Sequence, residues 1–191
     1  MTNVKDFIWK KIDPWGGNWH YVGTYEVVEI PHKLMKDGEL IDVISYRYMF
    51  YGTNVNKVIS TNKGVTDMSF MFCKLNSATL DLSNFYTSNV INMEGMFCGV
   101  KVKKLNLSNF DTSNVTTMWG MFLYSKTKEL DLSGFDTSNV TNMGDMFSQT
   151  RIEELDLSGF DTSNVTNTKG IFYNAKGNVT LNLEQFKISN K

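Results

Sequence analysis

The chain has 191 residues, of which 41% are hydrophobic, and its formal net charge is −1. This balance is typical of a folded domain and gives no reason to expect a nucleic-acid partner, whose binding needs a surplus of positive charge. No apolar run approaches the roughly 18 residues that a membrane-spanning helix needs, so no membrane span is expected.

Residues 1–21 match no repeat, yet they hold three of the four tryptophans, Trp9, Trp15 and Trp19. Two hypotheses fit this segment. It is an N-terminal aromatic cap that covers the first repeat, or an arm that binds a protein or a sugar. The segment lacks a secretory apolar region, which favours a cytoplasmic location.

Residues 22–64 carry an irregular form of the pattern that dominates the rest of the chain. An insertion of about eight residues, estimated from the repeat register, falls near the turn-rich string HKLMKDGEL, where we expect a hairpin-like excursion. Beyond it, residues 65–191 form regular 25-residue repeats.

Each repeat contains a valine, an apolar residue three positions later, and a Met-Phe pair at six and seven. The clearest copies begin at Val65, Val90, Val115 and Val140, with degenerate copies at Val43 and Val165. This spacing places the four apolar residues on one face of a short helical or 3₁₀ segment.

A second string, Leu-x-Leu-x-x-Phe, precedes each valine and predicts a short strand with one buried face. Its first leucines are Leu80, Leu105, Leu130, Leu155 and Leu181. Together the two strings predict a single elongated, right-handed, leucine-rich-repeat-like solenoid of short parallel strands and short helical segments.

Between the two strings lies Asp-Thr-Ser-Asn-Val, which is typical of a turn. Its asparagines recur as one column, Asn89, Asn114, Asn139 and Asn164. This column is interpreted either as a buried ladder that satisfies backbone groups or as a row that binds a ligand.

The strings LDLSNFYTSNVINMEGMF, LNLSNFDTSNVTTMWGMF and LDLSGFDTSNVTNMGDMF resemble the BspA-like leucine-rich-repeat surface proteins of bacteria and their mobile elements. The likeness is strong over about residues 50–180 and weaker over 22–50. It implies a curved parallel solenoid used for adhesion or protein binding, usually outside the cell, and it implies no catalytic residue.

Aromatic residues at variable positions are candidate partner contacts. Trp119 stands in a column with Ser69, Glu94, Gly144 and Lys169, whose variation predicts exposure. Tyr86 replaces the aspartate of its own column, and Tyr124 follows a Met-Phe pair. Together with Trp15 and Trp19, these residues are predicted to contact a partner; packing within the protein is the alternative.

The segments that connect the repeats are rich in basic residues. Lys101, Lys103, Lys126 and Arg151 are predicted to form a basic ridge along one edge, or else part of a solvated surface of mixed sign. An acidic protein surface suits this ridge better than nucleic acid, because the total charge is close to neutral and aromatics are not interleaved.

No recognisable catalytic, phosphate-binding, zinc or calcium pattern is present, so we expect no enzyme activity, no metal and no cofactor. Cys73 and Cys98, which stacked repeats bring close together, are interpreted as two small buried thiols, with a disulfide as the alternative. The sequence therefore predicts a non-enzymatic protein-binding or adhesion module. The alternative is a phage or mobile-element inhibitor that occludes a host protein inside the cell. An uncapped C-terminal edge suggests a homodimer.

Overall fold

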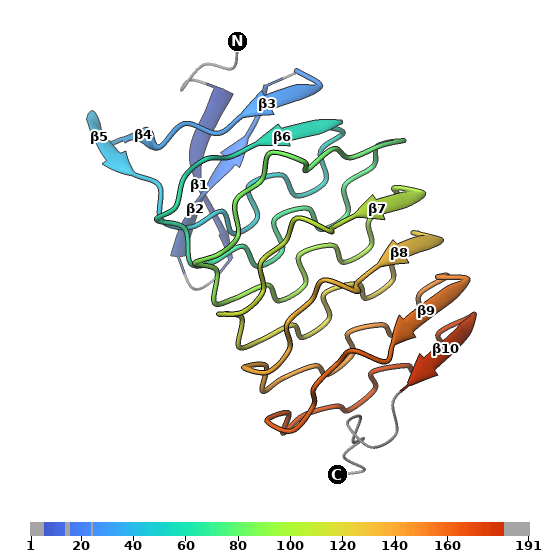
Figure 1. The fold of residues 1–191 in the computed structure, drawn as a ribbon. Coiled ribbons are helices and arrows are strands. Elements are labelled where there is room, and N and C mark those ends of the chain that lie inside the picture. The colour runs from blue at the N-terminus through green and yellow to red at the C-terminus, as the bar shows by residue number, and fades with distance from the viewer. Residues whose placement is uncertain (1–5, 14–15, 24, 182–191) are drawn as a thin grey trace.

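The computed structural model describes residues 6–13, 16–23 and 25–181. Within these ranges the chain forms short β-strands joined by turns, and it contains no α-helix (Figure 1). The strands are β1 (Phe7–Asp13), β2 (Gly16–Tyr21), β3 (Val27–Glu29), β4 (Lys33–Lys36), β5 (Glu39–Asp42), β6 (Lys57–Ile59), β7 (Lys104–Asn106), β8 (Glu129–Asp131), β9 (Glu154–Leu157) and β10 (Asn178–Leu181).

These strands make several small, separate sheets. Strands β1–β2 and β4–β5 are antiparallel hairpins, β3 pairs with β6 in parallel, and a parallel sheet has the order β10-β9-β8-β7. In the last sheet, residues 25 positions apart pair between β7, β8 and β9, as Leu105 does with Leu130, and residues 24 apart pair between β9 and β10. Isolated parallel bridges continue this register outside the strands, for example between Asn92 and Thr117. Successive 25-residue units therefore lie side by side.

The prediction of a leucine-rich-repeat-like solenoid with helical segments is wrong. The described residues form a domain of small sheets with almost no helix, and the Val-x-x-Met-x-x-Met-Phe strings are chains of turns. The physical reason is a left-handed residue at the fifth and the ninth position after each valine, which a right-handed helix cannot include. These residues are Tyr48, Gly52, Phe70, Lys74, Gly95, Gly99, Gly120, Tyr124, Asp145, Gln149, Gly170 and Asn174.

Alternate backbone groups in these turn strings bond in two different directions. Met71 N donates to Met68 O within its own turn, whereas Phe70 N and Phe72 N donate to Glu94 O and Met96 O of the next unit. The same alternation recurs from unit to unit. The turn strings thus hold neighbouring units together as a sheet would, which meets the requirement that buried amides be paired.

Side chains that recur every 25 residues form the core. Phe50, Phe72, Phe97, Phe122 and Phe147 stack in sequence with centroids 5.6–5.8 Å apart and nearly parallel planes. The methionines beside them are fully buried, as the apolar pattern predicts. Periodicity therefore identified the inward side chains correctly, although it predicted the wrong backbone.

Two hairpins interrupt the stack at its N-terminal end. The predicted excursion near residues 32–40 is confirmed as β4–β5, which turns at Asp37-Gly38 with positive φ at both residues. The β1–β2 hairpin lies against the first unit, where Tyr21 N donates to Met49 O at 2.9 Å. The Tyr21 ring also packs on Phe50 at 5.4 Å, so this hairpin covers the apolar end of the stack.

Two polar columns connect the units from opposite environments. The asparagine column is exposed, so the predicted buried ladder is wrong, but each amide still bonds a backbone carbonyl of the preceding unit, as Asn139 Nδ2 does with Ser113 O at 2.7 Å. The buried ladder is the threonine two positions earlier. Thr112 Oγ1 donates to Asp136 O and accepts from Asp136 N, both at 2.9 Å.

Candidate functional site

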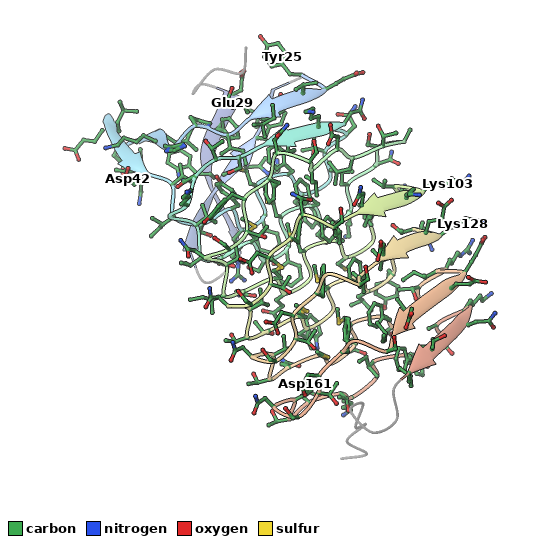
Figure 2. The ribbon with its side chains drawn as sticks, in the orientation of Figure 1. Tyr25, Glu29, Asp42, Lys103, Lys128 and Asp161 are labelled. Carbon is green, nitrogen blue, oxygen red and sulfur yellow. The ribbon has the colours of Figure 1, made fainter. Side chains whose placement is uncertain are left out.

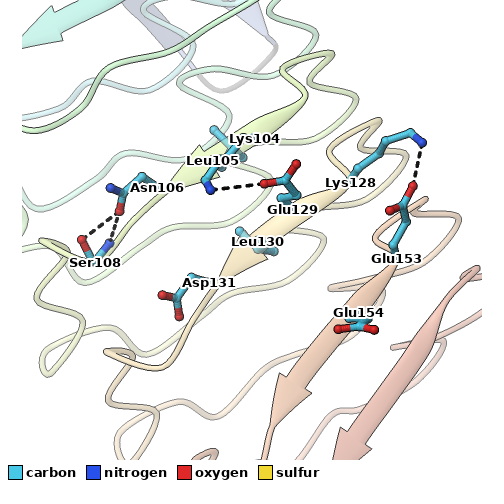
Figure 3. A pocket seen from close by; sticks show the side chains of 10 residues that line it. All are labelled: Lys104, Leu105, Asn106, Ser108, Lys128, Glu129, Leu130, Asp131, Glu153 and Glu154. Atoms are coloured by element: carbon cyan, nitrogen blue, oxygen red, sulfur yellow. Dashed lines mark hydrogen bonds and ion pairs between the residues drawn. The ribbon is translucent and has the colours of Figure 1, made fainter.

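A charged groove of about 530 Å³ lies over β7, β8 and β9, and we call it the strand groove (Figure 3). Leu130 forms part of its floor and is only half-buried, whereas Leu105 is 1% exposed. Strand β8 pairs with β9 only where Glu129 meets Glu154, while β7 and β8 pair over three residues. The short pairing coincides with the position of the groove.

The cations of the strand groove are neutralised by carboxylates of the next unit. Lys104 Nζ lies 3.2 Å from Glu129 Oε2, and Lys128 Nζ lies 2.6 Å from Glu153 Oε1 (Figure 3). The bond from Lys128 lowers the pKa of Glu153. Hydrogen bonds from Ser133 lower that of Asp131. Both cations of the strand groove are therefore paired with carboxylates, and Asp131 and Glu154 add negative charge to it.

A second groove of about 470 Å³ lies at the turns beyond the Met-Phe pairs, and we call it the basic groove. It is lined by Tyr124, Lys126, Gln149, Thr150, Arg151, Asn174, Ala175 and Lys176. Three lining residues are cations and none is a carboxylate, while Tyr124 is 48% exposed. This surface is suited to an anionic ligand.

The cations of the basic groove belong to one column with a spacing of 25 residues. Lys101, Lys126, Arg151 and Lys176 occupy equivalent positions in four successive units, and all four are exposed. None of them makes an ion pair with a carboxylate in the part of the chain that the structure describes. This column differs from that of Lys104 in the strand groove, where Glu129 and Glu154 occupy the equivalent positions of the next two units.

Three of the predicted partner contacts come together in the basic groove: Tyr124, Lys126 and Arg151. Lys101 and Lys103 are exposed but do not line it. Figure 2 shows Lys103 and Lys128 along one edge, far from Asp161. The predicted basic ridge is thus divided between the basic groove and the strand edge.

The predicted aromatic contacts have different environments. Trp15 lies outside the described residues, and Trp19 is 4% exposed and belongs to the core. Tyr86 is half-buried, with Lys63 Nζ 5.2 Å from its ring centroid. Trp119 is half-buried against Gly144, where an added Cβ would lie 2.9 Å from the indole Cδ1.

The column that contains Trp119 is not exposed throughout, contrary to the prediction. Ser69 is fully buried and Gly144 is buried, whereas Lys169 is exposed. Variation along this column reflects packing, because each side chain there must fit the size of its neighbour in the adjacent unit. The Trp119–Gly144 contact is the clearest instance.

Five residues of the basic groove were not predicted from the sequence: Gln149, Thr150, Asn174, Ala175 and Lys176. The signal for Lys176 was available, because it lies 25 positions after Arg151. Gln149 and Asn174 follow Tyr124 at the same interval, and all three have positive φ values of 52–59°. Their left-handed backbone, which orients the side chains, has no simple signature in a tyrosine or glutamine.

Other reactive groups in the structure have structural partners. Cys73 is buried and Cys98 half-buried, both are free thiols, and hydrogen bonding to Cys98 together with burial raises the pKa of Cys73. His32 Nε2 lies 3.1 Å from Thr61 Oγ1.

Among the described residues, no group of three or more His, Cys, Asp or Glu side chains could hold a metal ion. Nor is any helix there long and apolar enough to cross a membrane.

Comparison with known protein families assigns the chain to one of them. Residues 33–102 and 99–191 match the family described as "Mycoplasma protein of unknown function, DUF285", so the chain belongs to that family. The two matched segments together cover the β4–β5 hairpin and all the regular units. No curated protein and no solved structure matches the chain.

Proposed function

We propose that this chain is a non-enzymatic protein-binding module. The observation that carries the proposal is the contrast between its buried and exposed columns. The buried phenylalanine column is unchanged from Phe72 to Phe147, whereas the exposed or half-buried position two residues after each phenylalanine changes in every unit, being Lys74, Gly99, Tyr124 and Gln149. A scaffold that repeats its core and varies its surface is suited to recognising a partner surface.

The shape of the surface supports the same proposal. Both grooves are shallow features that extend across several units, and each is lined by side chains from successive repeats. Partner proteins bind repeat scaffolds in this manner, through contacts spread over several units. Adhesion at a cell surface and occlusion of an intracellular protein are two forms of this function.

The test is capture of a partner by the tagged full chain. Bacterial cytosolic and surface fractions would be incubated separately with the protein. Bound proteins would then be photo-crosslinked to it and identified by mass spectrometry. A matched control carries Met121→Asp, which places a charge in the core and is expected to unfold the chain. A saturable partner retained by the folded chain alone supports the proposal and shows which form applies. The absence of such a partner from both fractions contradicts it.

A further inference from the structure

We propose that the basic groove binds a short, extended acidic segment of a partner protein, through carboxylates that contact Lys126, Arg151 and Lys176. The inference rests on the proposed function and identifies the surface and the ligand chemistry. It starts from the unusual composition of one column. Some cations elsewhere on the surface face carboxylates of the next unit, as Lys57 faces Asp81, whereas this column holds four cations in succession.

The energetic argument concerns repulsion between like charges. Units joined by parallel pairing are about 4.8 Å apart, so cations in equivalent positions are close neighbours. Backbone bonds from Lys126 N to Val100 O and from Lys176 N to Thr150 O confirm that the units pack directly here. Like charges directly opposite each other on adjacent strands are unfavourable, and an anionic ligand would relieve that cost. The planar guanidinium of Arg151 can donate two parallel hydrogen bonds to the two oxygens of a carboxylate.

The groove also has neutral residues that suit a peptide. Tyr124 offers a half-exposed ring, while Gln149 and Asn174 offer amides that both donate and accept hydrogen bonds. These three side chains occupy left-handed positions, where Gly52, Lys74 and Gly99 stand in earlier units.

The length of the groove favours a peptide over nucleic acid. Three cations at successive units span about 10 Å, equal to about three residues of extended chain. The neighbouring strand groove carries Asp131 and Glu154, which would repel a long polyanion that extended past the site. A short acidic segment avoids that repulsion.

The experiment measures fluorescence anisotropy of a labelled octaglutamate peptide with the full chain. The groove variant is Lys126→Ala/Arg151→Ala/Lys176→Ala. A charge-matched control is Lys33→Ala/Lys63→Ala/Lys169→Ala, whose three positions are exposed and outside the groove. We expect at least a tenfold loss of affinity in the groove variant, a smaller loss in Tyr124→Ala, and a change within twofold in the control. Thermal melting of each variant establishes that it is folded.

Three outcomes would overturn the inference: no binding by the wild-type chain, an equal loss in both triple variants, or tighter binding of a thymidine octanucleotide than of the peptide. The captured partner gives an independent readout. If the groove variant retains that partner as well as the wild type does, the basic groove is not the binding surface, although the chain remains a protein-binding module. If no partner is captured, the proposed function itself fails.

Discussion

Individual residues in this protein are constrained by what lies 25 positions away. The clearest case is Gly95, which has a φ of 57° and lies beneath the ring of Phe70 in the preceding unit. Phe70 in turn stacks on Tyr48 at 5.0 Å. A glycine is needed at this point for two separate reasons, because both its backbone conformation and the space above it exclude a side chain.

Substituting Gly95 tests this double constraint. Gly95→Ala is expected to lower the free energy of unfolding by about 3 kcal/mol, since a left-handed alanine and the overlap with Phe70 add together. Gly52→Ala, at φ 69° with no atom within 4 Å of the added Cβ, is expected to lose only about 1 kcal/mol. Urea denaturation of both variants measures the difference. Equal losses would show that Phe70 does not restrict this position.

The threonine column is the second constraint at this scale. Thr112→Val keeps the side-chain shape but removes two bonds to the Asp136 backbone, so a loss of about 2 kcal/mol is expected. Thr116→Val is the matched control, because Thr116 is exposed and its bond to Ile91 O is 3.4 Å long. Chemical denaturation provides the measurement. A loss no greater than that of the control would mean that water replaces the buried hydroxyl at little cost.

Among the elements, the β1–β2 hairpin is the one that no repeat pattern specifies. It closes the N-terminal end of the stack with Phe7, Trp19 and Tyr21, which are at most 4% exposed. Tyr21 makes the most connections, because its ring contacts Phe50 and its hydroxyl accepts a bond from Tyr25 N at 2.9 Å. The tryptophan-rich composition of this segment fits both a cap and a binding arm, so the sequence could not distinguish the two.

Tyr21→Ala tests whether the hairpin stabilises the stack. Removing a buried aromatic ring is expected to cost about 3–5 kcal/mol and to lower the midpoint of the single unfolding transition. The control is Tyr173→Ala, whose side chain is 61% exposed and whose loss should stay within about 0.5 kcal/mol. Thermal and urea melts compare the two. A Tyr21 variant that melts like the wild type would mean that the hairpin only rests on the first unit.

At the scale of the whole molecule, repetition makes small local effects accumulate. The aspartates that follow Leu80, Leu130 and Leu155 each accept a bond from the backbone of the serine two positions later, as Asp131 does from Ser133 N at 3.0 Å. These bonds lower the pKa of Asp131 and of Asp156, and an equivalent bond from Ser138 lowers that of Asp136. All three depressed pKa values act in the same direction when the pH changes.

Acidification is therefore expected to destabilise the protein. A carboxyl whose pKa is lower in the folded state stabilises that state above the unfolded pKa, and the stabilisation is lost as the pH falls through the folded pKa. Melting temperatures should decline below about pH 4. The triple variant Asp131→Asn/Asp136→Asn/Asp156→Asn keeps the amide oxygen as an acceptor and should decline less steeply. An equally steep decline in the triple variant would assign the acid sensitivity to other groups.

The sequence by itself determined the 25-residue spacing, the inward phenylalanine, methionine and leucine columns, and the Asp-Gly hairpin. These features depend on local periodicity and turn chemistry, which are written directly in the residue order. Part of the basic groove could also be predicted from the sequence, because residues at equal intervals occupy equivalent places in successive units. Lys126 and Arg151 were identified for that reason.

Only the tertiary structure decided the backbone of the turn strings. Apolar residues at offsets 0, 3, 6 and 7 suit a helix as well as a run of turns, and the left-handed residues between them include Phe70, Tyr124 and Gln149, which rarely adopt that conformation. Bonds to the adjacent unit select it, since alternate amides find their acceptors there. The threonine column likewise depends on neighbours 24 residues away, to which its buried hydroxyls bond, and local patterns do not reveal these contacts.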